Sequence, residues 1–358
     1  MRIAITHPYS WPEVRRGAER IIVETSRALV ARGHSVTVFS AGSAASRVVD
    51  RGVTTIRYRR RFSGRFRHER WFGWRVLPAL RAGGFDVVHS MMPGDAVAAI
   101  RTARRAGHRT VYQELGNPIR ARIEGREDRA LRERVIGSID VYGCMSEFSR
   151  RFLEDEWGRA GAIIPGGVRV GEFSPRPRSK EPTILLSGAL DQPEKGLAEL
   201  LAAVALLAEE RPEVRLLLSG PGDPGPILAA APAVARERTE VLPIGAPEEL
   251  GERYATAWVT CLPTVWDSFG LVVIESLAAG TPVVVGPSGA PPEVVKPAIG
   301  VVAASLEPEP LHHALFDGLA LAERQGTVAA CRATATQYDW DAAIAPLLEN
   351  LYTGTQRC

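Results

Sequence analysis

Short runs of apolar residues alternate along this chain with longer segments in which apolar residues recur every three or four positions. The short runs are typical of buried strands, and the periodic segments are typical of amphipathic helices. Strands that are apolar on both faces need helices on both sides, so the pattern predicts parallel sheets in an α/β fold. In the first half, the predicted strands span 2–6, 35–40, 86–90, 110–113, 141–145 and 162–165, with a helix between 18 and 34.

A stretch rich in proline and arginine, at 172–182, interrupts this alternation. It has no apolar period, and we interpret it as a linker. A second α/β series follows, with predicted strands at 183–188, 214–220, 240–245, 259–263 and 282–286 and helices at 196–210, 247–257 and 270–279. Doubly wound domains bind ligands at the carboxyl ends of their strands, so two in tandem predict a central cleft between them.

The expected domain organisation has four parts. A chain of 358 residues exceeds one ordinary core, so two Rossmann-like domains are expected, over 1–173 and 183–337. The linker between them is placed at 174–182. The last segment, 338–358, contains an amphipathic pattern with aromatic residues at both ends, which predicts a C-terminal helix.

Composition narrows the class of protein. The apolar content of 45% and charged content of 24% are those of a soluble globular protein. No uninterrupted apolar run reaches the roughly 18 residues that a membrane span needs. The chain opens with a strand rather than a signal peptide, and its four cysteines have neither paired nor metal-like spacing. These features predict a reduced, cytoplasmic protein without structural zinc or any other bound metal.

Charge is distributed unevenly. Residues 1–175 hold 31 arginines and 18 acidic residues, a net charge of +13, whereas 176–358 hold 13 basic and 23 acidic residues, a net charge of −10. Eight arginines and six aromatic residues are interleaved in the segment 56–75. Such a segment suits either an anionic membrane surface or a groove for an anionic or aromatic molecule, the alternative being a solvated loop.

The segment "WDSFGLVVIESLAAGTPVVV", 266–285, contains two carboxylates in an otherwise apolar setting. A helix that begins after Gly270 is apolar around nearly its whole circumference, with Glu275 as its single charge. A buried carboxylate without a partner costs several kcal/mol, so a ligand or a side chain must satisfy it. Asp267 precedes the helix, whose first amides suit a phosphate. The two acids could each bind hydroxyl groups at one end of a ligand, and the helix start could bind phosphates between those ends. A nucleotide sugar is a ligand with this arrangement.

The order of motifs resembles that of the retaining GT-B glycosyltransferases, most closely glycosyltransferase family 4. The resemblance covers nearly the whole chain and rests on "RRGAERIIVETSRALVARGHSVTVFS", "DVVHS", "SEFSRRFL", "IIPGGVRVGEFSP", "LLSGALDQPEKGLAELLAAVALL", "DSFGLVVIE", "AAGTPVVVGPSGAPPEVV" and "YDWDAAIAPLLENLY". It implies a GT-B fold in which the C-terminal helix crosses back to the first domain.

The resemblance also implies roles for donor-site residues in the second domain. Glu275 would bind the nucleotide ribose, and Asp267, where the family usually has Glu, would contact the donor sugar. Lys195 would bind the diphosphate. The donor site would be completed by the backbone amides of Phe269, Gly270 and Leu271 and by Ile244. The family's usual arginine near Lys195 is replaced by Ala189, which removes a cation from the leaving group.

In the first domain the resemblance implies a phosphate loop at Arg16 and Gly17, where a second glycine is replaced by Ala18. Arg15 and Arg16 are candidate replacements for the missing cation. Leu115 stands where the family commonly has histidine. Four residues are assigned to the acceptor, namely His7, Glu114, Arg59 and Arg60, while His89 is interpreted as a packed strand-end residue.

The implied reaction is metal-independent transfer of a hexosyl group, with retention, from an α-nucleotide-diphosphate sugar to an acceptor hydroxyl. The acceptor would be a glycolipid or cell-envelope precursor, or a secondary metabolite, and no cofactor is expected. In the membrane alternative for the basic segment, this cytoplasmic protein would contact the inner membrane face peripherally through 57–75.

Alternative functions within this fold are a non-catalytic or weakly active nucleotide-sugar or glycan-binding protein and a nucleotide-sugar epimerase. A dehydrogenase is poorly supported because no Gly-x-Gly-x-x-Gly follows the first strand. Nucleic-acid binding has no motif in its favour.

Overall fold

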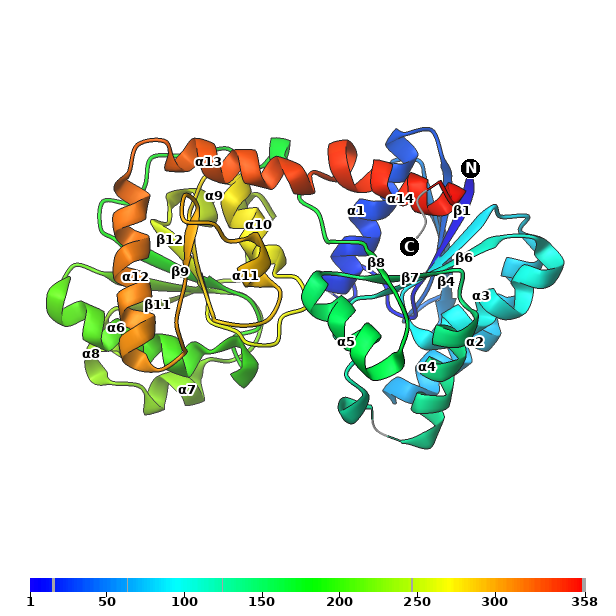
Figure 1. Ribbon diagram of the computed structural model, residues 1–358, viewed down its shortest axis with the longest axis horizontal. Coiled ribbons are helices and arrows are strands. Elements are labelled where there is room, and N and C mark those ends of the chain that lie inside the picture. The colour runs from blue at the N-terminus through cyan, green and yellow to red at the C-terminus, as the bar shows by residue number, and fades with distance from the viewer. Residues whose placement is uncertain (15–16, 63, 124, 246, 356–358) are drawn as a thin grey trace. The chain divides into compact units, whose positions relative to one another are not determined.

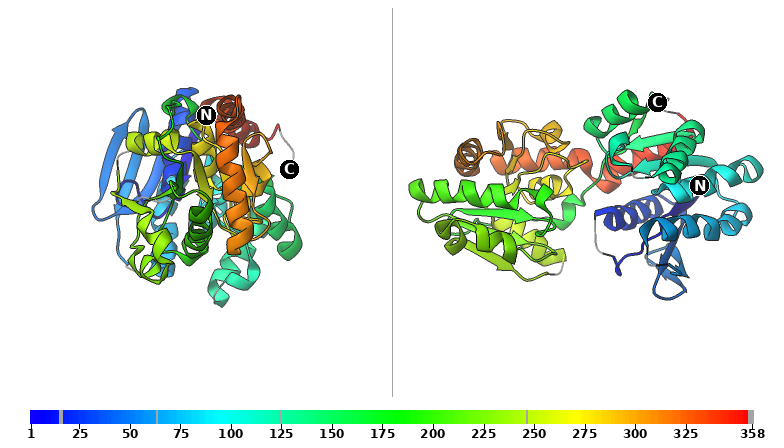
Figure 2. Two further views of the ribbon diagram at one scale, coloured as in Figure 1. Left: turned by 90° about the vertical axis from the view of Figure 1, so that its left-hand side faces the viewer. Right: turned by 90° about the horizontal axis from the view of Figure 1, so that it is seen from below.

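The computed structural model describes residues 1–14, 17–62, 64–123, 125–245 and 247–355. The chain forms two compact units, one of Met1–Gly167 with Trp340–Cys358 and the other of Val168–Asp339. The first unit's main segment ends at Gly167, six residues before the predicted domain end at 173. The second unit ends at Asp339, whereas its predicted end is 337. Each unit is a sheet with helices on both faces, as the alternation of strands and helices predicts (Figures 1 and 2).

The described part of the first unit contains a sheet of eight strands in the order β3-β4-β2-β1-β5-β6-β7-β8. All neighbouring pairs are parallel except β3 and β4, which form an antiparallel hairpin at the edge. The pattern of the sequence missed this hairpin because Ser46–Asp50 is solvent-exposed and has no buried face. The strands are β1 (Arg2–Thr6), β2 (Ser35–Gly42), β3 (Ser46–Asp50), β4 (Val53–Arg59), β5 (Val87–Ser90), β6 (Arg109–Glu114), β7 (Val141–Cys144) and β8 (Ala162–Ile163).

Two sets of helices cover this sheet. Its helices are α1 (Gly17–Ala31), α2 (Arg65–Ala82), α3 (Pro93–Ala106), α4 (Arg126–Ser138), α5 (Glu147–Trp157) and α14 (Ala345–Thr353). Val88 of β5 belongs to the apolar core under α2 and α3, whereas its neighbour His89 contacts Tyr352 of α14. Because successive strand residues point to opposite faces, α14 lies on the other face of the sheet, where it packs against α1.

The C-terminal segment is not the single helix expected over 338–358. It consists of a 3-10 turn (Thr336–Tyr338), a π-helical turn (Trp340–Ile344) and α14. Asp339 breaks the helix because its backbone is extended and pairs with Val168, while its carboxylate accepts a hydrogen bond from the amide of Val170 at 3.2 Å. Trp340 then packs directly on Gly167, where a side chain would collide with the indole ring.

The second unit has a wholly parallel sheet in the order β11-β10-β9-β12-β13-β14. Helices α6, α8 and α12 contribute to the apolar core on one face, and α9, α10 and α13 pack together away from that core. The strands are β9 (Thr183–Ser187), β10 (Arg215–Ser219), β11 (Thr239–Leu242), β12 (Val259–Leu262), β13 (Val283–Val285) and β14 (Gly300–Val302). The helices are α6 (Leu197–Glu210), α7 (Gly225–Ala230), α8 (Ala233–Glu237), α9 (Pro247–Thr256), α10 (Leu271–Ala278), α11 (Pro291–Val294), α12 (Pro308–Glu323) and α13 (Thr327–Ala335).

The described part of the chain contains buried free thiols, and it lacks candidate membrane-spanning helices and groups of metal ligands. Cys144, Cys261 and Cys331 are buried free thiols. None of the described helices combines the length and the apolarity that a membrane span requires. Among the described residues, no three His, Cys, Asp or Glu side chains are grouped so that they could hold a metal ion.

Candidate functional site

Two loops at the carboxyl ends of β9 and β12 meet in the second unit. The loop after β9 ends in a 3-10 turn, Pro193–Lys195, followed by Gly196 with φ +70°. A Cβ atom at Gly196 would lie 2.0 Å from the carbonyl oxygen of Pro263, in the loop after β12. Glycine is therefore required here both for the left-handed backbone and for the close approach of the two loops.

This approach joins two of the predicted site residues. The ammonium of Lys195 donates to Oδ2 of Asp267 at 3.0 Å, with side chains that are 24% and 19% exposed. Oδ1 of Asp267 accepts from the amides of Phe269 at 3.1 Å and Gly270 at 2.8 Å. Two of the three amides expected to face a diphosphate thus donate to the protein's own carboxylate, which caps the loop before α10.

The second predicted carboxylate lies inside α10. Gly270 begins this helix with φ +86°, and Glu275, one turn further on, is 4% exposed. The hydroxyl of Tyr254 on α9 donates to Oε2 of Glu275 at 2.9 Å, so a protein side chain contacts the buried carboxyl group. Sequence reasoning did not identify Tyr254. Its aromatic ring in a helix of mostly small and polar residues indicated burial, but nothing in the local pattern indicated its partner.

Arg253, next to Tyr254, is a further cation that sequence reasoning missed. Its guanidinium donates to the hydroxyl of Ser219, the last residue of β10, at 2.8 Å. The carbonyl of Ser219 accepts from the amide of Gly188 at 3.0 Å, directly before Ala189. Arg253 therefore reaches the edge of the sheet at which the family's usual arginine is replaced by alanine.

The other residues predicted for the donor site differ in their burial and position. The side chain of Phe269 is buried and packs edge-on against Tyr338, with ring centroids 5.7 Å apart, so only its backbone could bind a ligand. Ile244 is 70% exposed in the loop after β11. Gly17 is the first residue of α1 in the other unit. Arg16 and Arg15 lie outside the described residues.

Glu114, assigned to the acceptor, is part of a buried polar network in the first unit. Its Oε2 accepts from Arg132 at 2.5 Å, from Tyr112 at 2.9 Å and from Tyr142 at 3.4 Å. Burial acts to raise the pKa of Glu114, but the charge of Arg132 and these hydrogen bonds outweigh it, so the pKa is lowered and the carboxylate is ionised. This network connects β6, β7 and α4, which gives Glu114 a structural role of its own.

The two histidines at strand ends are both buried. His7 follows β1 and lies with its ring 5.6 Å from that of Tyr9. His89 has its Nδ1 2.7 Å from the hydroxyl of Tyr352, and burial lowers its pKa to about 4. Burial also raises the pKa of Tyr352, so a neutral imidazole and a protonated hydroxyl share this hydrogen bond. The interpretation of His89 as a packing residue agrees with these contacts.

The basic segment folds as the end of β4 and the start of α2, with ordered arginine–aromatic contacts. Arg60 lies 5.6 Å from the ring of Tyr9, and Arg75 lies 4.4 Å from that of Tyr58. A hollow of about 450 Å³ is lined by Arg59, Arg60, Arg61, Trp71 and Arg75, which we call the arginine hollow. Its described lining contains no carboxylate, so it favours an anion.

Comparison with known proteins matches each part of the chain to a glycosyltransferase family model. Residues 15–172 match the family described as Glycosyltransferase Family 4, and residues 171–327 match that described as Glycosyl transferases group 1. The chain is 29% identical to a phosphatidyl-myo-inositol mannosyltransferase of Mycobacterium tuberculosis over 97% of this chain and 96% of the relative. It is 35% identical to an MMP alpha-(1->4)-mannosyltransferase of Mycolicibacterium hassiacum over 38% of this chain and 33% of the relative.

Solved structures share the fold at lower sequence identity. A sucrose-phosphate synthase from Thermosynechococcus elongatus superposes with a TM-score of 0.84 at 20% identity, covering 99% of this chain and 98% of that one. The Anabaena protein HepE, solved in complex with UDP-glucose, superposes with a TM-score of 0.78 at 16% identity, covering 99% and 100%.

Proposed function

The chain belongs to the glycosyltransferases of group 1, family 4, with a GT-B fold, and we propose that it transfers a sugar from an α-nucleotide-diphosphate sugar to an acceptor hydroxyl with retention of configuration. The observation that carries this proposal is the Lys195–Asp267 ion pair at the start of a helix that contains the buried Glu275.

These three residues would supply the contacts that such a donor needs. Lys195 would offer a positive charge to the diphosphate, and the positive end of the α10 dipole would add to it. Asp267 is held by Lys195 in the structure, so arrival of a diphosphate would exchange one anion for another at the ammonium group. That exchange would release the carboxylate toward hydroxyls of the donor sugar. Glu275, a buried carboxyl group at which the hydroxyl of Tyr254 already donates, would also accept hydrogen bonds from the ribose.

The proposed chemistry places negative charge on the departing diphosphate. Lys195 would stabilise that charge, and Arg253 is the second candidate cation because it reaches the edge of the sheet beside Ala189. With side-chain cations in this role, transfer would proceed without a bound metal. In a retaining reaction the departing phosphate oxygen can take the proton of the acceptor hydroxyl, so no dedicated base is required.

The comparisons support the choice of donor to be tested first. The Mycobacterium tuberculosis relative and the Mycolicibacterium hassiacum relative are both named as mannosyltransferases, and HepE is described with UDP-glucose. GDP-mannose and UDP-glucose are accordingly the first two donors in a screen.

For the acceptor, we propose an anionic molecule that contacts the arginine hollow. Four arginines without a lining carboxylate favour a phosphate- or carboxylate-bearing group, and Trp71 adds an apolar surface beside them. A lipid-linked acceptor at an anionic membrane surface fits this chemistry, and the name of the Mycobacterium tuberculosis relative, phosphatidyl-myo-inositol mannosyltransferase, agrees with it. The protein would then work as a peripheral protein on the cytoplasmic face of the membrane.

The test is a hydrolysis screen of nucleotide sugars without acceptor, followed by product analysis with the donor that is consumed. Slow release of nucleoside diphosphate and free α-sugar supports the transferase. Tight binding without turnover would favour a nucleotide-sugar-binding protein instead. Release of the β-sugar would contradict retention, and an epimerised nucleotide sugar would indicate the epimerase alternative.

A further inference from the structure

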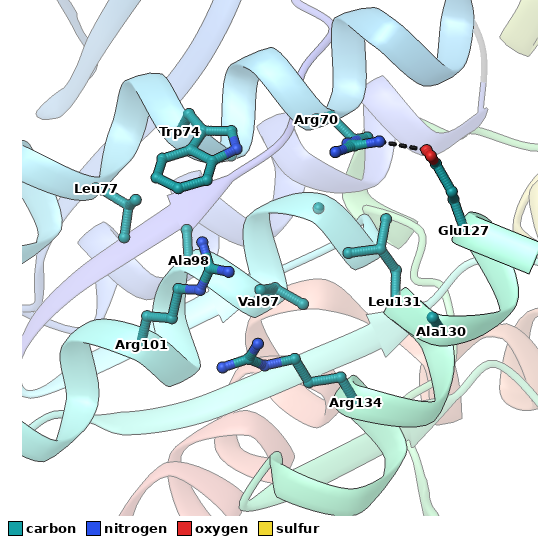
Figure 3. A pocket seen from close by; sticks show the side chains of 12 residues that line it. Arg70, Trp74, Leu77, Val97, Ala98, Arg101, Glu127, Ala130, Leu131 and Arg134 are labelled. Carbon is teal, nitrogen blue, oxygen red and sulfur yellow. Dashed lines mark hydrogen bonds and ion pairs between the residues drawn. The ribbon is translucent and has the colours of Figure 1, made fainter.

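The first unit carries a second groove, which shares no lining residue with the arginine hollow but includes Arg70, Gly73 and Trp74 of the basic segment 56–75. It lies between α2, α3 and α4 and has a volume of about 350 Å³ (Figure 3). Each helix contributes residues spaced i, i+3, i+4 and i+7, so one continuous face of each helix meets the groove. The lining consists of Arg70, Gly73, Trp74 and Leu77 from α2, Gly94, Val97, Ala98 and Arg101 from α3, and Glu127, Ala130, Leu131 and Arg134 from α4.

The floor of this groove is apolar and accessible. The close crossing of α2 and α3 depends on two glycines, since a Cβ atom at Gly73 would lie 2.4 Å from the carbonyl oxygen of Gly94. With small residues at these positions, the larger apolar side chains form walls rather than filling the space. Trp74 remains 62% exposed, and Leu131 is only partly buried. Such a surface suits an apolar chain, because binding removes the apolar surface of both partners from water.

The groove is lined by three arginines and one glutamate, so its net charge is positive. Arg70 of α2 forms an ion pair with Glu127 of α4, as Figure 3 shows. Arg101 and Arg134 form no ion pair within the described part of the chain, and no acidic residue stands three or four positions from either along its helix. The guanidinium groups of both point into the groove from facing helices, and Arg101 lies 4.9 Å from the ring of Trp74.

We propose that this groove binds a single anionic lipid, with an acyl chain on the apolar floor and its phosphate between Arg101 and Arg134. The combination of two uncompensated guanidinium groups and a narrow apolar floor is complementary to a molecule that has both a chain and an anionic head. A docked protein would require about 800 Å² of contact on this side, far more than a groove of this size offers.

This site goes beyond the proposed transfer reaction. The candidate donor residues Lys195, Asp267 and Glu275 all belong to the other unit, and the arginine hollow has a different lining. The groove would therefore hold a lipid whether or not that lipid is glycosylated.

The experiment measures binding of dodecyl phosphate to the full chain by isothermal titration calorimetry, at concentrations below micelle formation. Dodecanol, which lacks the charge, and ethyl phosphate, which lacks the chain, are titrated alongside. We expect dodecyl phosphate to bind at least ~10-fold more tightly than either, because only it engages both the floor and the arginines. Equal affinity for dodecanol would overturn the role of the arginines.

Two variants test whether dodecyl phosphate binds in this groove. Arg101→Gln with Arg134→Gln should weaken dodecyl phosphate at least ~10-fold, and Leu131→Asp should do the same by adding a carboxylate to the floor. Arg104→Gln with Arg105→Gln is the matched control, since it removes two exposed arginines of α3 that do not line the groove. Undiminished binding in the first double variant, or equal loss in the control, would overturn the proposal. Binding is read directly, so failure of the transfer assay would leave this result unaffected.

Discussion

Lys195 and Asp267, 72 positions apart in the sequence, are joined by an ion pair of 3.0 Å between two loops at the edge of one sheet. The pair is partly exposed to solvent, so it contributes little to stability and its partners can be exchanged at low cost. A cation that is held by a carboxylate until an anionic ligand arrives is suited to diphosphate binding. The same contact keeps Asp267 next to the start of α10.

Lys195→Ala should lower kcat/KM by about 100-fold, because in the proposed reaction the ammonium would stabilise charge that grows in the transition state. Stability should change by less than about 1 kcal/mol, as for other exposed ion pairs. Donor-dependent turnover and urea unfolding measure the two effects. Unchanged turnover would show that this loop does not contact the diphosphate.

The companion variants Ala189→Arg and Arg253→Gln test whether the site lacks a cation. If Arg253 already supplies the second positive charge, Arg253→Gln should reduce turnover by about 10-fold, and Ala189→Arg should restore it. A large gain from Ala189→Arg alone would instead mean that Arg253 does not reach the diphosphate.

Asp267→Ala should reduce transfer at least ~100-fold through loss of a contact to the donor sugar. It should also destabilise the protein by about 1 kcal/mol, because two amides before α10 lose their acceptor. Asp267→Asn keeps an acceptor for those amides, so its stability should stay near that of the parent while activity falls. Equal activity of the parent and both variants would remove Asp267 from the proposed site.

Glu275→Ala should likewise cost at least ~100-fold in kcat/KM, measured with the donor identified by the hydrolysis screen. Tyr254→Phe removes one hydrogen bond to this carboxylate and should cost less than 10-fold in activity, since the ribose contacts would remain. If Tyr254→Phe proved as damaging as Glu275→Ala, the carboxylate would act through its protein partner rather than through the ribose.

Replacing Arg59, Arg60 and Arg61 together with Gln should strongly reduce flotation with vesicles that contain anionic lipid, while hydrolysis of the free donor continues. Each arginine near such a surface contributes about 1 kcal/mol, which salt screens. The parent should therefore float at low salt and be released at high salt. Absence of flotation by the parent, combined with loss of transfer to a soluble acceptor in the variant, would assign the arginine hollow to acceptor binding alone.

His89 should make stability depend on pH below neutrality. Burial lowers its pKa from 6.5 to about 4, so the unfolded chain takes up a proton first as the pH falls. Stability from this residue is complete above pH 7 and is lost between pH 6.5 and 4, by about 2 kcal/mol at pH 5. Urea unfolding of the parent and His89→Gln at pH 7.5 and 5 measures the difference. A parallel loss in both proteins would show that His89 does not titrate in this way.

The sequence alone determined the two α/β units, their parallel sheets and the family, because buried strands, helix periodicity and motif order are all local features. It did not predict the β3–β4 hairpin, the edge strand β14 or the Asp339 break in the C-terminal segment. An exposed edge strand has no apolar period, and the break depends on pairing with Val168, far away in the chain.

Only the tertiary structure decided which side chains meet. The partners of Asp267, Glu275 and Glu114 come from other elements, and nothing near them in the sequence marks Lys195, Tyr254 or Arg132 as those partners. The groove between α2, α3 and α4 is the clearest case. Each helix displays an ordinary spacing of small, apolar and charged residues, and only the packing of the three faces together makes a site, because a binding surface is set by distances in space that local periodicity does not encode.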